Sequence, residues 1–412
     1  ENALAELIES GRLLEHLWFY DAPVNYKCKK LENAKPGKFI RLIADLGVHA
    51  SLQGFVLTGM LKKAMAANVF EYNGGIIEFC PKPSPTSLER IFALLIDPPR
   101  DKRFYFVYFS DDSCIAFRTP TGTIVRANVD ISSCDASHTQ HLFNEMRTLL
   151  SGEANRNINL LIDQLGSPFT VKSGDGPEKV LLKPITERLY SGSTLTTVTN
   201  NFACITIAVG ISETGLTGLK DITSGARNAG YIVTCDDASS NYNLLQFLKH
   251  SPCYDTSREL RAVLNVGVIL RLSGTCKGDL PGRKSTPLRE RAEAMQAALI
   301  QGAAPYTSYT LIENLKAHAG TATQATTAIV EAEMAYRVVQ EESPVRYFTD
   351  SEIFRRYGLN PEQIAQVNEF GCMGFEESVS GPAFDAILRL DYGLDTVPFG
   401  DPRVADSEYA YI

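Results

Sequence analysis

The chain has 412 residues and a formal net charge of −8, with 44% hydrophobic and 21% charged residues. This composition fits a globular protein with a large core and two or three subdomains, and it excludes a disordered tail and a coiled coil. No apolar run reaches the roughly 18 residues that a membrane span needs. The negative charge argues against a surface coated in basic residues for non-specific nucleic-acid binding, but it leaves room for a local basic channel.

The N-terminus and the cysteines indicate the kind of chain. The sequence Glu1-Asn2-Ala3-Leu4 lacks the basic-then-apolar form of a signal peptide, and the absence of an initiating Met predicts a fragment or a processed product. Nine cysteines are spread out with no two within four residues, so reduced thiols of an intracellular protein are favoured over disulfides or a zinc-type pair. His138 and His141 have a ligand-like spacing, but without a third ligand a helix surface is the favoured interpretation.

The first predicted elements surround a basic cluster. Residues 4–20 predict an amphipathic helix, and residues 50–69 predict a second helix. Between them lies the sharpest basic cluster of the chain, made of Lys27, Lys29, Lys30, Lys35, Lys38 and Arg41. Pro36 and Gly37 interrupt this cluster, so a loop or extended ribbon is expected there rather than a helix.

An acidic hairpin is expected next. The aromatic run 104–109 has strong strand propensity, and the apolar residues 114–117 predict a partner strand. Asp111-Asp112 lies between them and would occupy the turn.

A third strand carries another carboxylate. Residues 119–122 form a good turn sequence, and residues 124–131 predict a strand with Asp130 near its end. If the three strands pair, Asp130 converges with Asp111-Asp112 at one end of a sheet.

The rest of the chain shifts from mixed to helical. Residues 139–150 predict a helix, and the Gly-, Pro-, Ser- and Asp-rich residues 165–180 predict a loop. A short strand is expected at 231–234 and a strand-like segment at 262–272. The predicted helices of the last part are 287–301, 309–318, 322–341 and 361–369. The outline is an α/β first half and a helical C-terminal third.

The carboxylates have the composition of a two-metal site. Phosphoryl transfer to a 3′-hydroxyl uses two divalent cations about 3.5–4 Å apart, and Mg²⁺ needs only a few carboxylates on rigid strands. Asp111-Asp112 alone is more often an acidic surface turn. Two further patterns change that balance: Asp135 follows Asp130 by five residues, and residues 191–200 read Ser-Gly-x3-Thr-x3-Asn.

These segments resemble the conserved motifs of viral RNA-dependent RNA polymerases. Asp130 and Asp135 match the first palm motif (A), and Ser110-Asp111-Asp112 matches the third (C), whose usual form is Gly-Asp-Asp. The second motif (B) is matched by Ser191, Gly192, Thr196 and Asn200. By resemblance, 27–41 is the fingers motif F, 225–237 is motif D and 245–250 is the primer grip, motif E. The resemblance covers about 25–275 by motif and the thumb by position only.

The motif order is unusual, because the best motif C precedes A and B. A rival motif C, Asp236-Asp237, stands in the usual place, but turn-like residues follow it where a metal-bearing hairpin needs a second apolar strand. Phe247 begins the next motif too soon for a motif D helix and strand to fit between. The permuted order C-A-B is therefore preferred. It resembles the polymerases of permuted insect tetraviruses (the Thosea asigna virus type) and, more distantly, of birnaviruses, which replace the last motif C Asp by Asn; Asp112 is nearer the tetravirus type.

The resemblance implies a right-hand α/β (α+β) polymerase fold with fingers, a palm on a small antiparallel sheet of permuted connectivity, and a helical thumb. The implied boundaries are fingers at 1–100, palm at 101–139, a fingers insertion at 140–186, palm at 187–275, and thumb with a C-terminal segment at 276–412.

The resemblance also implies template-directed RNA synthesis with Mg²⁺, or alternatively Mn²⁺, as the metal. Asp111 and Asp130 would bind both ions, and Asp112 would assist. Recognition of the ribose 2′-hydroxyl is implied for Asp135, Ser191, Thr196 and Asn200. Triphosphate binding is implied for Lys30, Lys38 and Arg41, and template or primer contacts for Gly192 and Lys249. One departure is that Ala238 aligns with the lysine that motif D usually carries.

The implied partners are an RNA template, the nascent strand and ribonucleoside triphosphates, with other viral proteins or a protein primer as further candidates. The implied location is the cytoplasm of an infected host cell, or the virion. Two rival functions stay open. A reverse transcriptase is disfavoured because those enzymes place an aromatic steric gate where Asp135 stands, and a non-catalytic RNA-binding protein with this fold is disfavoured by three intact carboxylates.

Overall fold

The computed structural model describes residues 25–28, 42–45, 69–81, 83–149, 152–172, 179–273, 283–324, 343–374 and 379–393, with a few single positions between these ranges. The chain divides into two compact units, one of residues 1–81 and 97–239 and the other of residues 82–96 and 240–412. The predicted helix at 4–20, most of the basic cluster and most of the predicted helix at 322–341 lie outside the described residues. No helix in the described part of the chain is long and apolar enough to cross a membrane.

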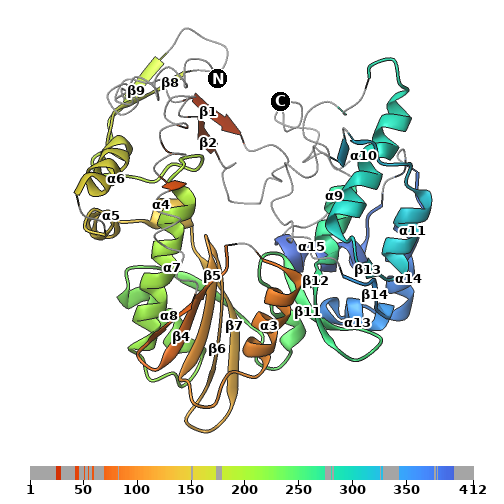
Figure 1. Ribbon diagram of the computed structural model, residues 1–412, viewed down its shortest axis with the longest axis horizontal. Helices are drawn as coiled ribbons and strands as arrows, with labels where there is room; N and C mark the ends of the chain where they lie inside the picture. Colours follow the sequence, from red (N-terminus) through yellow and green to blue (C-terminus); the bar gives the residue numbers. More distant parts are fainter. Residues whose placement is uncertain are drawn as a thin grey trace. The chain divides into compact units, whose positions relative to one another are not determined.

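A six-stranded sheet forms the centre of the first unit (Figure 1). Its order is β10-β7-β6-β5-β4-β3, and every neighbouring pair is antiparallel except β4 and β5. The strands are β3 (Val69–Tyr72), β4 (Gly75–Phe79), β5 (Phe104–Phe109), β6 (Asp112–Arg118), β7 (Ile124–Ile131) and β10 (Val233–Asp237). The strands predicted at 104–109, 114–117 and 124–131 are confirmed, and the sheet is mixed rather than purely antiparallel.

The burial of the strands follows their sequences. β5 is apolar throughout and buried at every residue but the last, as expected for a strand covered on both faces. β7 alternates between buried and more exposed residues, which is typical of a strand with one face toward the core. Both patterns place the core of this unit on the central strands.

Helices α5 (Gln140–Met146), α6 (Gly152–Leu165), α7 (Thr196–Ser212) and α8 (Leu219–Asn228) complete the core of the first unit. α7 contacts β5 and α8, and buried residues occur all along it. A Cβ atom on Gly225 of α8 would lie 2.5 Å from the Ile211 Cα atom, so only glycine lets these two helices approach so closely.

The predicted loop over 165–180 is wrong at its two ends. β8 (Phe169–Lys172) and β9 (Lys179–Leu182) pair as an antiparallel hairpin. Each strand is only four residues long. The turn-forming residues between the strands dominate the composition of the segment, so the two short β-branched and apolar runs were not recognised as strands. A second small hairpin pairs β1 (Asn25–Cys28) with β2 (Leu42–Asp45).

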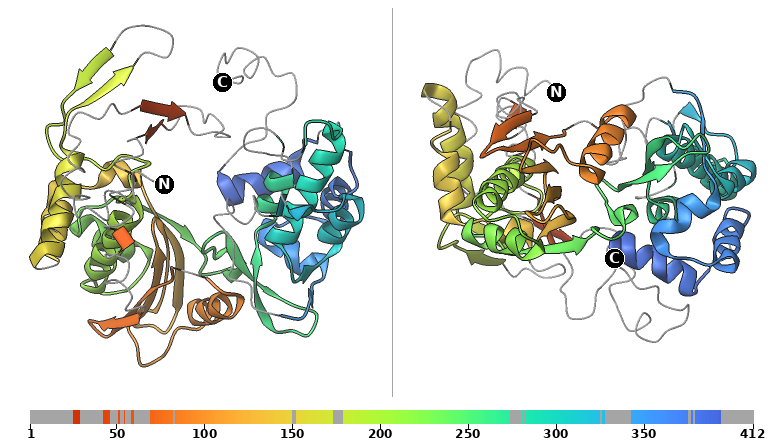
Figure 2. Two further views of the ribbon diagram at one scale, coloured as in Figure 1. Left: turned by 45° about the horizontal axis from the view of Figure 1, so that its top comes forward. Right: turned by 90° about the horizontal axis from the view of Figure 1, so that it is seen from below.

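The second unit is mainly helical, with its own core (Figure 2). Helix α3 (Pro85–Ile96) packs on the hairpin of β11 (His250–Tyr254) and β12 (Leu260–Leu264). The predicted helices at 287–301, 309–318 and 361–369 are confirmed as α10 (Leu288–Ala303), α11 (Thr310–His318) and α14 (Pro361–Phe370). The remaining elements include α9 (Val266–Ser273), α13 (Asp350–Phe354), η3 (Arg355–Tyr357), α15 (Pro382–Tyr392), η2 (Tyr242–Leu244), β13 (Thr307–Ser308) and β14 (Arg346–Tyr347).

The strand-like prediction over 262–272 is wrong in its second half. The strand β12 ends at Leu264, and the apolar residues that follow form helix α9. A short, continuous apolar run has no periodicity that separates a buried strand from a buried helix. The tertiary contacts of α9 with α10 and α15 decide the outcome.

A buried carboxylate lies at the centre of the second unit. The Asp391 side chain is fully buried and pairs with the Arg356 guanidinium at 3.2 Å. The Tyr357 hydroxyl and the Gly267 backbone N–H each donate a hydrogen bond of 2.8 Å to it. Burial and the neighbouring Asp391 charge raise the pKa of Tyr357 well above its usual value, so the tyrosine stays a donor. This network joins α9, η3 and α15.

We expect Asp391→Asn to lower the free energy of unfolding by about 3 kcal/mol, because it leaves the buried Arg356 charge without its counter-ion. Urea denaturation measures the change. Glu362→Gln, at an exposed position in the first turn of α14, is the control and should change stability by less than about 0.5 kcal/mol. Equal effects of the two substitutions would contradict a central role for the pair.

Candidate functional site: an acidic sheet edge beside a buried polar cluster

The predicted carboxylates meet at one edge of the sheet in the first unit. Asp111 lies in the turn after β5, and Asp112 begins β6. In the register of β6 and β7, Asp112 stands directly opposite Asp130, a position in which Cβ atoms are about 4.5–5.5 Å apart. Asp111 and Asp130 are exposed, and Asp112 is half-buried. Exposed carboxylates on adjacent strands have the donor chemistry that a hard divalent cation takes.

The rival acidic pair lies elsewhere on the sheet. β10 pairs with β7 so that Thr234 is opposite Asp130, whereas Asp236 is opposite Asn128. Asp236 is therefore displaced from Asp130 by two residues, or about 7 Å along the strand. The carboxylates next to Asp130 are those of the β5–β6 turn.

The same register bears on the missing lysine. Ala238 follows β10, and its N–H donates to the Arg126 carbonyl oxygen at 2.9 Å. Arg126 is four residues before Asp130 on β7, about 13 Å along the strand. Position 238 therefore lies about four strand residues away from the acidic edge.

Helix α7 holds the turn that carries Asp111. Ser110 has a left-handed backbone with φ of 55°, a conformation that non-glycine residues adopt at some cost. Its N–H donates to the Asn201 side-chain oxygen at 2.6 Å, and its carbonyl accepts from the Cys204 thiol at 3.1 Å. Burial and the charges of nearby groups, Asp111 among them, raise the pKa of Cys204 well above its usual value, so the thiol remains a donor.

Three residues predicted to recognise a ribose form one hydrogen-bonded cluster. Asp135 lies in the short helix α4 (Cys134–Ser137), Ser191 lies in the turn before α7, and Asn200 lies within α7. The Ser191 hydroxyl donates to one Asp135 carboxylate oxygen, and the Asn200 amide donates to the other at 3.3 Å. The sequence motifs that predicted these residues thus meet in space. Thr196 instead donates to the Tyr190 carbonyl oxygen at 3.4 Å.

Gly192 lies where no side chain fits. Its φ is 101°, and a Cβ atom there would lie 2.5 Å from the Ala44 carbonyl oxygen. The Ala44 N–H donates to the Ser191 carbonyl oxygen at 2.8 Å. Glycine at 192 therefore lets β2 lie directly against the loop that carries Ser191.

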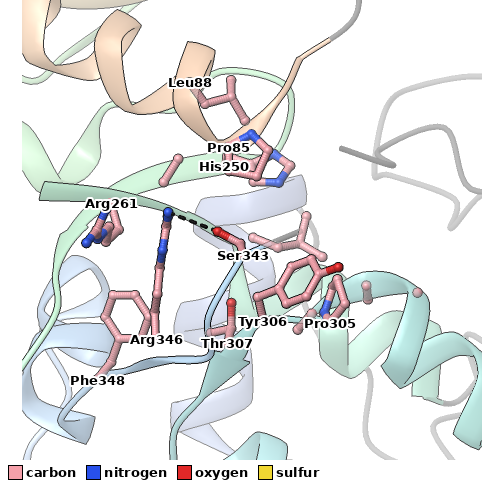
Figure 3. A pocket seen from close by; sticks show the side chains of 15 residues that line it. Pro85, Leu88, His250, Arg261, Pro305, Tyr306, Thr307, Ser343, Arg346 and Phe348 are labelled. Atoms are coloured by element: carbon pink, nitrogen blue, oxygen red, sulfur yellow. Dashed lines mark hydrogen bonds between the residues drawn. The ribbon is translucent and has the colours of Figure 1, made fainter. Parts of the chain in front are cut away.

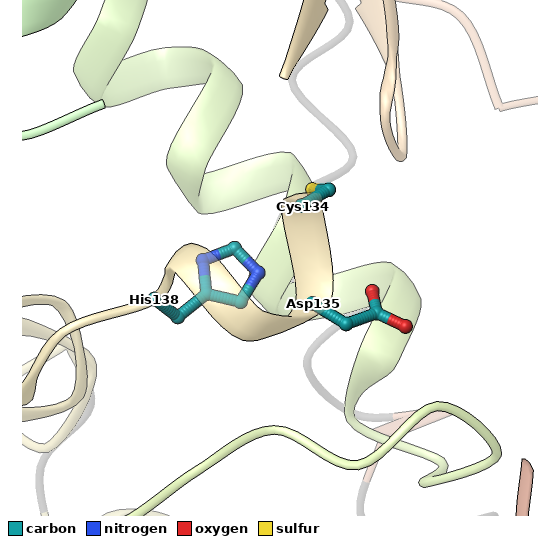
Figure 4. A group of neighbouring side chains, drawn as sticks. All are labelled: Cys134, Asp135 and His138. Atoms are coloured by element: carbon teal, nitrogen blue, oxygen red, sulfur yellow. The ribbon is translucent and has the colours of Figure 1, made fainter. Parts of the chain in front are cut away.

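A buried histidine completes the cluster (Figure 4). The His138 Nε2 atom lies 2.8 Å from the Asn200 side-chain oxygen, and its Nδ1 atom lies 3.2 Å from the Tyr231 hydroxyl. Burial lowers the pKa of His138, so the ring is neutral near pH 7. His141, which has a ligand-like spacing from His138 in the sequence, is exposed on α5.

Cys134, Asp135 and His138 lie close enough to share a metal ion, but their chemistry opposes it. Both ring nitrogens of His138 already have hydrogen-bond partners. Burial raises the pKa of the Cys134 thiol most, and the charges of Asp111, Asp135 and Asp130 raise it further. Because a metal binds the thiolate, a thiol that stays protonated is a poor ligand. We therefore assign no metal to this group.

The remaining predicted site residues are placed less completely. Lys30, Lys38 and Arg41 lie outside the described residues. Lys249, in the second unit, has φ of 61°; its ammonium donates to the Asp391 carbonyl oxygen at 2.6 Å and lies 4.5 Å from the centre of the Tyr392 ring.

A cavity in the second unit is a poor substrate site (Figure 3). Its volume is about 70 Å³, several times below the roughly 300 Å³ lower limit of ligand pockets. His250, Arg261, Tyr306 and Arg346 are among its lining residues. Arg346 pairs with Glu89 of α3, and Arg261 pairs with both Glu89 and Asp255, so their charges are already compensated.

Sequence reasoning missed Asn201, Cys204, Tyr231 and the role of His138. Asn200 and Cys204 have the i, i+4 spacing of one helix face, but no helix was predicted over the residues of α7, so this signal was missed. The contact of that face with Ser110 depends on how α7 packs on the sheet.

The fold and the site together define a mixed α/β protein with an acidic sheet edge beside a buried polar cluster. Among solved structures, it is similar to a chain of the birnavirus VP1–VP3 complex, with a TM-score of 0.50 at 12% sequence identity. The match covers 96% of this chain and 54% of that chain, so this chain spans about half its length. No protein-family model and no curated protein matches the sequence. The similarity is one of fold.

We expect Asn201→Ala to lower the free energy of unfolding by about 1–3 kcal/mol, because the Ser110 N–H loses its acceptor. Urea denaturation measures the change. Asn228→Ala, at an exposed position at the end of α8, is the matched control and should change stability by less than about 0.5 kcal/mol. A loss no larger than that of the control would show that Asn201 does not hold the turn.

Proposed function

We propose that this protein is an RNA-directed RNA polymerase that replicates and transcribes a viral RNA genome. The observation that carries the proposal is the pairing of Asp112 opposite Asp130, next to Asp111 in a turn held by α7. The fold similarity to a chain of the birnavirus VP1–VP3 complex supports it, because the motifs also resemble those of birnavirus polymerases.

The acidic edge is the proposed metal site. Asp111, Asp112 and Asp130 would hold two Mg²⁺ ions, with Mn²⁺ as a substitute, because hard cations take carboxylate oxygens from rigid strands. When bound, the ions activate the attacking 3′-hydroxyl and stabilise the charge on the leaving pyrophosphate. The protein fixes the carboxylates by strand register and by the hydrogen bonds to Ser110.

The polar cluster is the proposed sugar site. Asp135 and Asn200 would exchange part of their mutual hydrogen bonding for the ribose 2′-hydroxyl, with Ser191 in support. A substrate without that hydroxyl would gain none of these hydrogen bonds, which is the basis for discrimination.

The permuted motif order C-A-B is part of the proposal. With the sheet order β10-β7-β6-β5, the strand proposed for motif A would lie between the proposed motif C hairpin and the strand proposed for motif D. Carboxylates need only converge in space, so chain order is irrelevant to the metals. Asp112 keeps the proposed relationship nearer the permuted tetravirus type than the birnavirus type.

In this assignment, the fingers comprise 1–100 and 140–186, the palm comprises 101–139 and 187–275, and the thumb begins after 275. Lys30, Lys38 and Arg41 of the fingers would contact the triphosphate, and Gly192 and Lys249 would lie near template or primer. The structural neighbour is a complex of VP1 with VP3, which supports a second viral protein as a partner of this chain, in the infected cell or the virion.

The first test is primer extension on an RNA template with Mg²⁺ and each nucleotide class. The unaltered chain should incorporate rNTP, and Asp111→Ala should lower incorporation at least about 100-fold, because it removes a carboxylate that would hold the metal ions.

Asp236→Ala is the matched control for this test, because it removes an exposed carboxylate of the same sheet and should leave the rate within about twofold. A greater loss for Asp236→Ala than for Asp111→Ala would transfer the metal site to the rival pair. A preference for dNTP would indicate a reverse transcriptase, and no incorporation would indicate a non-catalytic RNA-binding protein.

The second test concerns the sugar. Asp135→Ala and Asn200→Ala should each reduce the preference for rNTP over dNTP by about tenfold or more, because each removes a partner of the 2′-hydroxyl. Steady-state kcat/KM for both nucleotides gives the ratio. An unchanged ratio in both variants would overturn the sugar-recognition roles.

A further inference from the structure

A continuous chain of hydrogen bonds runs from Tyr231, in the segment assigned to motif D, into the proposed sugar site. It passes from the Tyr231 hydroxyl to His138 (3.2 Å), from His138 to Asn200 (2.8 Å) and from Asn200 to Asp135 (3.3 Å). Tyr231, His138 and Asn200 are 4%, 6% and 3% exposed. The links from Tyr231 to His138 and from His138 to Asn200 therefore join buried side chains.

The donors and acceptors along the chain are fixed by its carboxylate end. A carboxylate only accepts, so the Asn200 atom that faces Asp135 must be the amide nitrogen. The amide oxygen then faces His138, whose Nε2 must carry a proton and donate. Because the neutral ring has one proton, its Nδ1 accepts, and the Tyr231 hydroxyl must donate. Only one arrangement satisfies every group.

The Asn200 amide therefore depends on His138 for its orientation. Without a donor at His138, the amide oxygen would lose its partner, and rotation of the amide by 180° would turn an acceptor toward the Asp135 carboxylate. Such a rotation would repel that carboxylate and remove the amide donor from the sugar site. Tyr231 fixes the tautomer on which the whole orientation rests.

We infer that His138 and Tyr231 are positioning residues that set ribose selectivity by orienting the Asn200 amide. The inference rests on the proposed polymerase function and deepens it. Neither residue touches the substrate; both act through Asn200. The Tyr231 ring lies edge-on to the His138 ring, with centroids 5.9 Å apart and planes at 71°, so its hydroxyl reaches Nδ1 while the rings pack.

The positions of His138, Asn200 and Tyr231 in the fold support these positioning roles. His138 follows α4, Asn200 belongs to α7, and Tyr231 precedes β10. The Ser132 N–H donates to the Ile232 carbonyl oxygen at 2.9 Å, which ties the Tyr231 segment to the end of β7. The chain of hydrogen bonds therefore depends on how α4, α7 and the segment before β10 are placed around Asp135.

The experiment measures kcat/KM for rNTP and dNTP with His138→Leu and Tyr231→Phe, in primer extension by the full chain. His138→Leu removes the donor to Asn200, and we expect the rNTP/dNTP ratio to fall about tenfold, with dNTP use retained within about threefold. Tyr231→Phe keeps the ring packing and removes only the hydroxyl, and it should lower the ratio about threefold. His141→Leu, at an exposed histidine on α5, is the matched control and should not change the ratio.

A double-mutant cycle with Asn200→Ala tests the route of the effect. If His138 acts through Asn200, then His138→Leu changes the ratio less than twofold in the Asn200→Ala background. Equal loss of rNTP and dNTP use would mean a purely structural role and would overturn the inference, as would a full tenfold effect in that background. If His138→Leu does not fold, the Tyr231→Phe ratio decides. An unchanged ratio in a chain that incorporates rNTP overturns only this inference, whereas no incorporation by the unaltered chain overturns the polymerase proposal and this inference with it.

Discussion

The hydrogen bond from the Ser110 N–H to the Asn201 side chain is the interaction on which the site depends most. Ser110 has a left-handed backbone, and such residues persist only where their surroundings over-determine them. Asn201 is 1% exposed, so solvent has little access to this hydrogen bond. The Asn201 side chain is held in place because helix α7 is buried. Its hydrogen bond in turn holds the Ser110 turn in place. The position of Asp111 is therefore set by α7 as much as by the strands that flank it.

Consecutive residues of one helix thus serve two sites. Asn200 points its amide at Asp135, whereas Asn201 reaches the backbone of Ser110. Neighbouring residues on a helix project about 100° apart, which lets one helix hold the acidic edge and the polar cluster at a fixed separation. Burial of two amides has a desolvation cost, and both are hydrogen-bonded, as buried polar groups must be. A change in the packing of α7 would consequently disturb both sites together.

Much of this site was predictable from sequence, for identifiable reasons. The strands around Asp111-Asp112 are long and aromatic or apolar, and a tight turn separates β6 from β7, so their pairing follows from local pattern. The meeting of Asp135, Ser191 and Asn200 followed from a resemblance to motifs and not from spacing. The contacts of Asn201, His138 and Tyr231 join elements up to about a hundred residues apart in the chain, and no local pattern encodes them. The β8–β9 hairpin and helix α9 were misjudged because short apolar segments carry too little periodicity.

The proposed motif order has a consequence for how the site forms. Strands β5, β6 and β7 follow one another as a meander, and the three carboxylates of the acidic edge lie within residues 111–130. Closing short loops costs little entropy, so this part of the sheet is assembled from local contacts. The polar cluster instead needs Asn200 and Ser191, which come some sixty residues after Asp135. The meander can therefore pair before α7 arrives, but the Ser110 turn stays unsupported until it does. In this order of events, packing of α7 is common to both sites, which ties the geometry of the acidic edge to that of the polar cluster.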